Sequence, residues 1–383
     1  MRLEKVEAIL DLAYTARLDK LEPVTIHLLG PPGIGKSAIV KQWAMKKAKQ
    51  LGKKWVDVDN LDREGLENIL RNPSAYFLFA DRRLMSLLPE DLSGIPRDVG
   101  EFVQFKPLLL AKMLAECSGI LFLDEYLYEK RENMKASSFK LIRDFKMGDL
   151  AMSQNVIVIA ASNDPKHSAG SDPMWIPQRD RFVMIYVDSP SIEAWTTWMD
   201  ETFGVDGWDR TCLAYLRWKP SDFLTNVEDL GTDDGVAPPA SPRGWTIVST
   251  YLLPKRSEHL DQDQMQSFII GKLGTVGERY WAFRQNKVPS FDELAKDPSV
   301  IAHFKIEQKY LAAVTIAEAV NAAKERIKKA VPILEFIAKN DDREIISALF
   351  AFLSQQRRTE VFTAVRDISV IYKAMERTGK ALL

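Results

Sequence analysis

The chain has 383 residues, and its 52 basic and 53 acidic residues give a formal net charge of -1. This length exceeds what one hydrophobic core usually organises, so we expect two or three domains. The near balance of charge leaves no whole-molecule field that would favour nucleic acid or a membrane surface. The two cysteines, Cys117 and Cys212, have no CxxC or Cys/His companions, which argues against a disulfide scaffold or a structural zinc site.

The N-terminal segment, residues 1–23, mixes charged residues into an amphipathic helical pattern. It lacks the uninterrupted apolar stretch of a signal peptide. No later segment has an apolar run long enough to span a bilayer. We therefore expect a soluble, cytoplasmic protein.

Short apolar runs in the first half of the chain predict strands. They begin at Val24, Trp55, Tyr76, Ile120, Val156 and Phe182. Several are nearly continuous in Val, Ile, Leu and Phe, as is typical of parallel strands that are covered on both faces. Helical patterns separate them, so the sequence predicts an α/β domain with a doubly wound parallel sheet over residues 1–189. Ligands of such sheets bind at the carboxyl ends of the strands.

The second half of the chain has a different pattern. Short helical patterns follow residue 189, and residues 227–244, rich in Asp, Gly and Pro, predict a loop. From residue 299 to residue 383 the chain is mostly helical. Its strongest signal lies at residues 310–339, where Ala, Leu and Ile recur at helical spacing until Pro332 interrupts the pattern.

The first predicted strand leads into "GPPGIGKS", residues 30–37, which matches G-x-x-x-x-G-K-[ST] between a strand and a helix. Glycines let consecutive N–H groups point at phosphate oxygens, and the following helix adds the positive end of its dipole. Lys36 supplies a charge for the β and γ phosphates, and Ser37 offers a hydroxyl to magnesium. A glycine-rich turn that merely contains Lys-Ser is the alternative, and the flanking strand and helix argue against it. The residues predicted to bind the nucleotide are Pro32, Gly33, Ile34, Gly35, Lys36, Ser37 and Ala38.

An acidic pair ends another buried strand, in "GILFLDEY". Beside the phosphate loop, Asp124 suits the magnesium shell, and Glu125 suits a role in orienting the attacking water or accepting its proton. The alternative is an ordinary acidic strand end. The combination with Lys36 and Ser37 favours the functional interpretation.

A polar residue ends the next strand, in "VIVIAASND". Between two strands of one parallel sheet, Asn163 would lie near the γ phosphate, where its amide could bond phosphate and water. Alternatively, Asn163 and Asp164 make a turn before Pro165. Spacing alone does not separate these two interpretations.

Five segments resemble, in chain order, the parts of an AAA+ ATPase. "GPPGIGKS" resembles Walker A, "ILFLDE" Walker B, "AASND" sensor 1, "RDRF" the arginine-finger region and "SPRGW" sensor 2. Within that superfamily, residues 81–105 resemble the MoxR branch, in which this segment leads into a loop or hairpin inserted in the second helix. Residues 146–155 similarly resemble the hairpin that precedes sensor 1. The resemblance covers roughly residues 28–253.

The resemblance implies a Mg²⁺-dependent ATP hydrolase with further functional residues. Asn163 and Arg243 would contact phosphates as sensors 1 and 2. Arg181, within "DRF", matches the arginine that reaches a neighbouring subunit's ATP, with Arg179 as the alternative. Residues 190–298 would form a helical lid. Residues 299–383 would be a helical C-terminal extension that the family pattern does not explain.

The resemblance also implies partners. A MoxR-type protein forms a ring, commonly a hexamer, remodels or activates a protein client, and often cooperates with a von Willebrand factor A domain protein. Both hairpins would lie towards the pore, where Phe102, Val103 and Phe105 would grip the client. The alternative is that these three side chains pack beneath their own hairpin.

Two other functions stay open. The first is a nucleic-acid-directed AAA+ motor or helicase loader, and the basic segment at residues 324–329 is its best support, although such segments are commonly solvated helix faces. The second is a nucleotide-gated scaffold with very slow turnover. Intact Asp124 and Glu125 argue against this scaffold.

Overall fold

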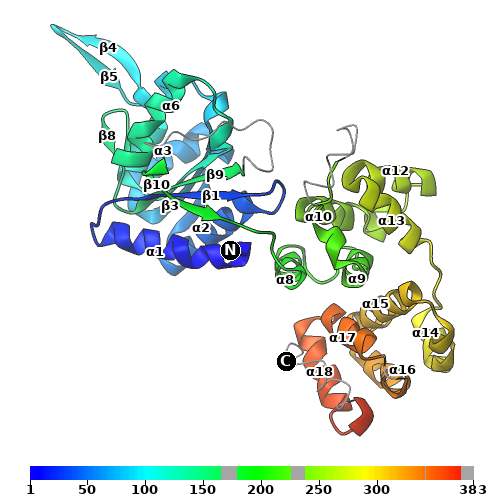
Figure 1. The fold of residues 1–383 in the computed structure, drawn as a ribbon. Helices are drawn as coiled ribbons and strands as arrows, with labels where there is room; N and C mark the ends of the chain where they lie inside the picture. Colours follow the sequence, from blue (N-terminus) through cyan, green and yellow to red (C-terminus); the bar gives the residue numbers. More distant parts are fainter. Residues whose placement is uncertain (165–178, 226–237, 341, 372–383) are drawn as a thin grey trace. The chain divides into compact units, whose positions relative to one another are not determined.

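The computed structural model describes residues 1–164, 179–225, 238–340 and 342–371. The chain divides into two compact units, Met1–Pro190 and Ser191–Leu383, which are described separately (Figure 1). Two predicted segments lie partly outside the described residues: most of the predicted loop at residues 227–244, and residues 372–383 of the predicted extension.

The described part of the first unit contains a six-stranded parallel sheet in the order β10-β1-β9-β6-β3-β2. The strands are β1 (Thr25–Gly30), β2 (Lys54–Asp57), β3 (Tyr76–Arg83), β6 (Ser118–Asp124), β9 (Val156–Asn163) and β10 (Phe182–Tyr186). All six predicted strands belong to this sheet. The predicted fold class, a doubly wound P-loop α/β domain followed by a helical region, is confirmed.

Helices cover both faces of the sheet. The helices of this unit are α1 (Val6–Leu18), α2 (Lys36–Gln50), α3 (Arg63–Arg71), α4 (Pro89–Ser93), α5 (Leu109–Glu116) and α6 (Glu132–Phe139). On one face, Tyr14 of α1 and Trp43 of α2 pack against Phe77 of β3. On the other face, Leu78 and Leu121 belong to an apolar cluster that includes residues of α4, α5 and α6. Burial on both faces explains why the central strands are nearly continuous apolar runs.

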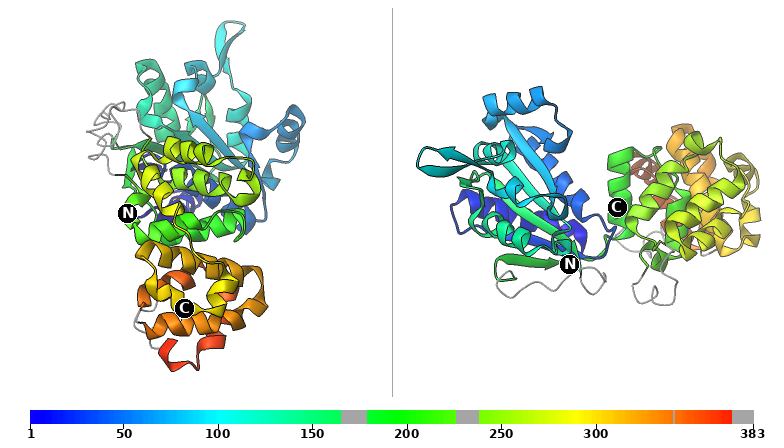
Figure 2. Two further views of the ribbon diagram at one scale, coloured as in Figure 1. Left: turned by 90° about the vertical axis from the view of Figure 1, so that its right-hand side faces the viewer. Right: turned by 90° about the horizontal axis from the view of Figure 1, so that it is seen from above.

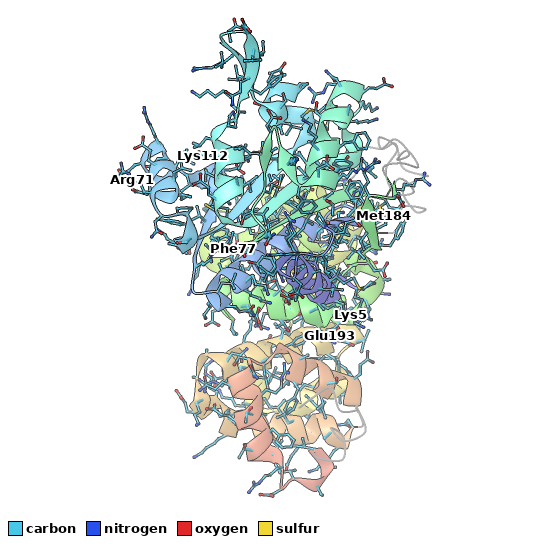
Figure 3. All side chains as sticks on the ribbon, turned by 90° about the vertical axis from the view of Figure 1, so that its left-hand side faces the viewer. Lys5, Arg71, Phe77, Lys112, Met184 and Glu193 are labelled. Atoms are coloured by element: carbon cyan, nitrogen blue, oxygen red, sulfur yellow. The ribbon has the colours of Figure 1, made fainter. Side chains whose placement is uncertain are left out.

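In the first unit, large apolar side chains such as Phe77 lie in the core, and charged side chains such as Arg71 lie on the surface. Figure 3 shows Phe77 inside it, and Arg71 and Lys112 on its outside. Phe77 and Phe122 are fully buried. Because burying one such ring contributes roughly 1.5–3 kcal/mol, this sheet holds its strand ends in a fixed arrangement.

Two antiparallel hairpins interrupt the α/β pattern where the sequence predicts them. The first consists of β4 (Ile95–Val99) and β5 (Phe102–Lys106), and it extends away from the sheet in Figures 1 and 2. The second consists of β7 (Lys146–Met147) and β8 (Leu150–Ala151), just before β9. All ten residues of β4 and β5 are exposed. Phe102, Val103 and Phe105 are 73%, 60% and 43% exposed. The alternative prediction, that these residues pack beneath their own hairpin, is therefore wrong.

The described part of the second unit is helical. Its helices are α8 (Ile192–Phe203), α9 (Thr211–Trp218), α10 (Pro242–Tyr251), α11 (Pro254–Ser257), α12 (Gln262–Leu273), α13 (Thr275–Arg284), α14 (Phe291–Lys296), α15 (Ile306–Ala322), α16 (Ile327–Lys339), α17 (Arg343–Phe352) and α18 (Gln355–Val365). One apolar cluster runs through them from Trp195 to Ile371. Helix α15 lies at its centre, packed against α9 and α17.

The prediction that Pro332 interrupts the long helical pattern is wrong. The interruption comes earlier, between α15 and α16, and Pro332 lies inside α16. An interior proline removes one backbone hydrogen bond and costs about 3 kcal/mol. The buried side chains of Ile333, Leu334 and Ile337 offset this cost, while Pro332 itself is on the exposed face.

No helix among the described residues has both the length and the apolar character that crossing a membrane requires.

Candidate nucleotide-binding site

The carboxyl ends of three adjacent strands, β1, β9 and β6, meet at one edge of the sheet. Gly30 at the end of β1 pairs with Asn163 at the end of β9, and β6 ends beside them at Asp124. The polar side chains that end these parallel strands lie together, because the strands leave the core at the same edge. The sheet therefore assembles side chains that lie more than a hundred residues apart in the sequence.

The phosphate loop follows β1 directly. Gly33 and Gly35 have φ angles of 73° and 103°, in the left-handed region that favours glycine. Gly30 is required for space, because a Cβ there would lie 2.2 Å from the carbonyl oxygen of Val187. Ile34 is buried and anchors the middle of the loop, while Pro32 is exposed.

Helix α2 begins at Lys36, and its N-cap residue, Gly35, has no side chain that could cap the helix. The first turn, which includes Ser37 and the exposed Ala38, carries backbone N–H groups without intrahelical partners. Together with the helix dipole, these groups favour an anion at this position. The loop and helix start therefore fit phosphate, as the sequence predicts.

Lys36 reaches back over the loop and is only 8% exposed. Its Nζ donates to the carbonyl oxygens of Gly30 and Pro31, at 2.9 and 2.8 Å, and to Oδ1 of Asn163 at 3.1 Å. The ammonium group is thus fixed between the loop and the end of β9. A charge held in this way is preorganised for an anionic ligand.

The two predicted magnesium ligands are in contact. The hydroxyl of Ser37 donates to Oδ2 of Asp124 at 2.8 Å, and Oδ1 of Asp124 accepts from the backbone N–H of Glu125 at 2.9 Å. Hydroxyl and carboxylate oxygens are hard ligands of the kind that Mg²⁺ prefers. Among the described residues no group of three or more His, Cys, Asp or Glu side chains could hold a metal. A site with one carboxylate fits Mg²⁺, which commonly takes its remaining ligands from phosphates and water.

Glu125 has an unusual backbone conformation, with φ 55° and ψ 32°. Its Oε2 lies 3.7 Å from Nε of Arg83, at the end of β3, and both side chains are about half exposed. Non-glycine residues in this region are uncommon and store strain of about 1–3 kcal/mol. The turn at Glu125 directs the following 3-10 helix, η5 (Tyr126–Tyr128), back towards β9.

Asn163 contacts two parts of the site. Its Oδ1 accepts from Lys36, and its Nδ2 donates to the hydroxyl of Tyr128 at 3.1 Å. The residue ends β9, and the turn before Pro165 that the sequence left open reaches beyond the described residues. The sequence analysis singled out neither Tyr128 nor Arg83 as a site residue. No sequence pattern indicates the Tyr128 contact, since it depends on the reversal at Glu125.

A buried polar contact links strands β1 and β9 within the sheet, next to the site. His27 of β1 is fully buried, and its Nε2 lies 2.9 Å from Oγ of Ser162, which also accepts from the backbone N–H of Leu127 at 3.0 Å. Burial, with a smaller effect from the charge of Lys36, lowers the pKa of His27 to about 3. The ring is therefore neutral at physiological pH and joins β1 to the end of β9.

Asp81, on β3 next to β6, also has a shifted pKa. Burial, and then the charge of Asp124, raises the pKa of its carboxyl group to about 6. The carboxylates of Asp81 and Asp124 add negative charge to this end of the sheet. A bound divalent cation would relieve that repulsion.

The predicted finger arginines lie just before β10, in the first unit. The guanidinium of Arg181 lies 5.0 Å from the centre of the Phe139 ring, and the residue is half-buried. Arg179 is exposed. Arg243 is the second residue of α10 and belongs to the second unit, where its side chain is exposed. The predicted roles of all three arginines stay predictions.

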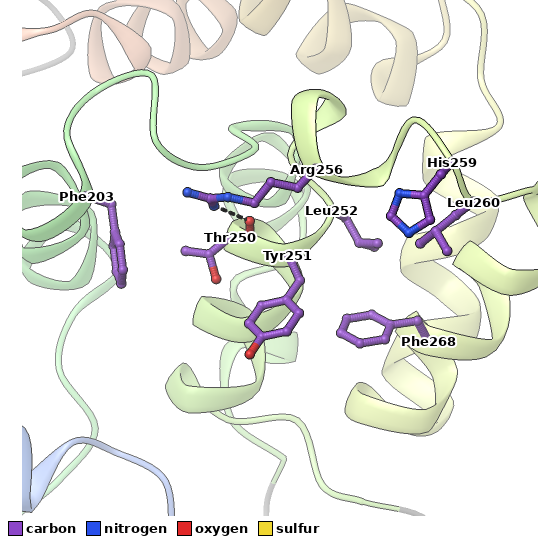
Figure 4. A pocket seen from close by; sticks show the side chains of 8 residues that line it. All are labelled: Phe203, Thr250, Tyr251, Leu252, Arg256, His259, Leu260 and Phe268. Carbon is purple, nitrogen blue, oxygen red and sulfur yellow. Dashed lines mark hydrogen bonds between the residues drawn. The ribbon is translucent and has the colours of Figure 1, made fainter.

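A pocket in the second unit contains none of the predicted site residues. Its lining is Phe203, Thr250, Tyr251, Leu252, Arg256, His259, Leu260 and Phe268 (Figure 4). The ring of Tyr251 stacks on that of Phe268 with centroids 5.8 Å apart. The guanidinium of Arg256 donates to the backbone oxygen of Thr250 at 2.5 Å. This lining is mostly apolar, so it does not resemble a phosphate site.

Comparison of the sequence with protein-family models and with curated proteins gives no match. Among solved structures, the chain is similar to the RuvB Holliday junction branch migration motor of Thermotoga maritima, with 16% identity over 80% of this chain and 84% of that one, at a TM-score of 0.29. It is also similar to the Orc1 protein of Aeropyrum pernix in complex with DNA, with 12% identity over 98% of this chain and 95% of that one, at a TM-score of 0.34. Scores this low carry no argument about family or function. The fold class follows from the sheet, the phosphate loop and the helical region themselves.

Proposed function

We propose that the chain is a Mg²⁺-dependent ATP hydrolase of the AAA+ type, resembling the MoxR branch, that remodels or activates a protein client as an oligomeric ring. The observation that carries the hydrolase proposal is the convergence of Lys36, Ser37, Asp124 and Asn163 at the ends of three adjacent strands. These residues come from three separate segments of the sequence. Phosphoryl transfer depends mainly on such positioning and charge neutralisation.

Each residue of the site has a proposed task. Residues 32–38 and Lys36 in particular would hold the phosphates, and Ser37 and Asp124 would hold Mg²⁺. The nucleotide supplies the phosphoanhydride bond, and the cation neutralises charge on the phosphates. Glu125 would orient the attacking water and accept its proton. Asn163 would hydrogen-bond phosphate and water.

The proposal extends to assembly. Arg181 would reach the ATP of a neighbouring subunit, with Arg179 as the alternative, and Arg243 would contact phosphate from the helical lid at residues 190–298. A trans arginine is worth roughly 10³ to 10⁵ in rate. A hexameric ring and a von Willebrand factor A partner remain parts of this proposal that rest on the MoxR resemblance. A cytoplasmic location is also part of it, and rests on the sequence pattern of residues 1–23 and the lack of a long apolar run.

The exposed hairpin β4–β5 supports a protein client. Its Phe102 and Val103 are exposed although they are apolar. Contiguous exposed apolar residues commonly mark interaction sites. The tasks of residues 299–383 and the identity of the client are not part of the proposal.

The nucleic-acid alternative rested on the basic segment at residues 324–329, and this segment is engaged within its own unit. Lys324 pairs with Glu360 at 3.1 Å and Lys329 pairs with Asp292 at 3.0 Å. Arg326 lies over the ring of Phe291. These contacts neutralise part of the charge that phosphate groups would require. Steep, salt-dependent stimulation of ATP hydrolysis by DNA would nevertheless favour this alternative.

Steady-state phosphate release tests the proposed function. Wild type should hydrolyse ATP in the presence of Mg²⁺, Lys36→Ala should lose nucleotide binding, and Glu125→Gln should bind ATP yet turn over at least about a hundredfold more slowly. Lys46→Ala is a matched control, since Lys46 lies on the same helix and pairs with Glu7 on the surface. Equal inactivity of wild type and Glu125→Gln, across concentrations that include the assembled state, would overturn the enzyme proposal.

A further inference from the structure

The side chain of Asn163, a predicted site residue, links Lys36 to Tyr128, a tyrosine that the sequence did not indicate. The hydrogen-bond chemistry fixes the orientation of its amide. Lys36 Nζ has only donors, so the atom of Asn163 facing it must be the carbonyl oxygen. The NH₂ group then faces Tyr128, whose hydroxyl accepts from it at 3.1 Å.

Tyr128 reaches this position because the chain reverses at Glu125. Directly after the left-handed residue, η5 brings two consecutive residues against the end of β9. The N–H of Leu127 donates to Oγ of Ser162, and the hydroxyl of Tyr128 accepts from Asn163. Two adjacent hydrogen bonds, Leu127 to Ser162 and Asn163 to Tyr128, therefore join the segment after the acidic pair to the end of β9.

Lys36 alone leaves the amide of Asn163 incompletely held. One hydrogen bond restrains the oxygen but not the rotation that carries the NH₂ group around it. An acceptor on the opposite side removes this freedom, and a group held in one orientation loses less entropy when it engages a reacting phosphate. Tyr128 is half-buried, and Tyr126 lies two residues before it in the same 3-10 helix. The hydroxyl of Tyr126 lies 3.1 Å from Oγ of Ser138, so Tyr126 provides a comparison.

We propose that Tyr128 is a positioning residue for Asn163. Its hydroxyl holds the Asn163 amide in one orientation, with the oxygen facing Lys36 and the NH₂ group facing Tyr128. This inference rests on the proposed ATP hydrolysis. Tyr128 acts through Asn163 and is not itself a catalytic residue. Its loss lowers the turnover of bound ATP while leaving the phosphate loop, and hence ATP affinity, intact.

The test compares Tyr128→Phe with Tyr126→Phe. Tyr128→Phe should lower kcat about tenfold, the effect of one hydrogen bond of about 1.4 kcal/mol, and keep KM and nucleotide affinity within about twofold. Tyr126→Phe removes a buried hydroxyl from the same 3-10 helix and should leave kcat within about twofold of wild type. An unchanged kcat in Tyr128→Phe, with an active wild type, would overturn the inference and leave the proposed function standing.

A double-mutant cycle assigns the effect to the pair, because a tyrosine hydroxyl can serve more than one partner. In an Asn163→Ala background, Tyr128→Phe should change kcat by less than about twofold. A full tenfold loss in that background would show that Tyr128 acts elsewhere and would contradict the inference.

The side-chain NH₂ resonances of Asn163 provide a readout that does not need activity. Assigned by their loss in Asn163→Ala, they should shift in Tyr128→Phe and stay in place in Tyr126→Phe. Inactivity of wild type would refute the proposed hydrolysis and the catalytic part of this inference. Unshifted Asn163 resonances in Tyr128→Phe would refute the positioning contact itself.

Discussion

His27 lies fully buried on the strand that ends in the phosphate loop, and its side chain forms a hydrogen bond with that of Ser162. Rings of Tyr126 and Phe182 pack beside it. A protonated imidazole would be expensive in these surroundings, and the nearby charge of Lys36 adds to that cost. The burial that makes His27 a rigid support therefore also makes the first unit sensitive to acid.

The folded-state pKa of His27, about 3, lies below the ordinary value of 6.5. Between pH 6.5 and pH 3, His27 therefore binds a proton in the unfolded chain but not in the folded one. The free energy of unfolding is highest above pH 6.5 and decreases as the pH falls below that value. Between pH 7 and pH 5, wild type should lose about 2 kcal/mol more unfolding free energy than His27→Gln, whose amide can keep the bond to Ser162. Urea unfolding at both pH values measures the difference. His303→Gln, which alters an exposed histidine, should behave as wild type, and equal pH dependence in all three proteins would contradict the prediction.

The predictability of the site differs from residue to residue. Lys36, Ser37 and Asp124 were predictable because their chemistry is tied to fixed spacing from strand ends, and strand ends meet at one edge of a parallel sheet. Tyr128 was not predictable in this way. Its contact with Asn163 depends on the left-handed conformation of Glu125, which no local residue pattern signals.

At the scale of elements, the six strands were predictable from their apolar runs, whereas the breaks in the C-terminal helices were not. The structure ends α15 at Ala322 and continues α16 through Pro332. Burial of one face of α16 outweighs the local cost of proline. Propensity is a weak guide where tertiary packing decides.

The cost of an interior proline gives a prediction for α16, in which Pro332 is exposed. Pro332→Ala should restore a backbone N–H in an exposed helical position and raise the unfolding free energy of the chain by about 1–2 kcal/mol, after allowing for the greater freedom of the unfolded chain. Lys328→Ala, an exposed change in the same helix, should alter it by less than about 0.5 kcal/mol. Chemical unfolding followed by circular dichroism checks both. A loss of stability in Pro332→Ala would show that the ring itself makes a required contact.

The hairpin β4–β5 carries apolar residues that do not contribute to the fold. Phe102→Ser should change the unfolding free energy by less than about 0.5 kcal/mol, because the ring is 73% exposed. Phe122→Ala, in the buried centre of β6, should cost about 3–5 kcal/mol. Urea unfolding distinguishes these outcomes. A large loss in Phe102→Ser would return the ring to a packing role and remove the support that the hairpin gives to a protein client.

At the scale of the whole molecule, each unit has its own core, and the helical unit shares one apolar cluster from Trp195 to Ile371. The sequence predicted a boundary between a lid and an extension at residues 298 and 299 from a change in helical pattern. That boundary stays a prediction. Sequence periodicity identifies the buried face of a helix but not the partner that covers it, which is why the shared cluster was not anticipated.

Assembly gives the last prediction. If Arg181 completes the ATP site of a neighbouring subunit, Arg181→Ala should bind ATP and hydrolyse it about 10³-fold more slowly. Lys36→Ala should be inactive because its own site cannot hold ATP, yet it keeps Arg181. An equal mixture should then recover up to about a quarter of the wild-type rate, because half of the subunits keep the loop and half of their neighbours donate the arginine.

The stacking of Arg181 on Phe139 requires a control for folding. Thermal unfolding of Arg181→Ala should stay close to that of wild type, and the mixture should be measured at concentrations where activity per subunit no longer rises. Arg179→Ala, assayed in the same way, decides between the two arginines. Recovery with Arg179→Ala alone would assign the trans contact to the more exposed residue. No recovery with either would mean that neither arginine crosses a subunit boundary, and a ring would then have no catalytic reason to form.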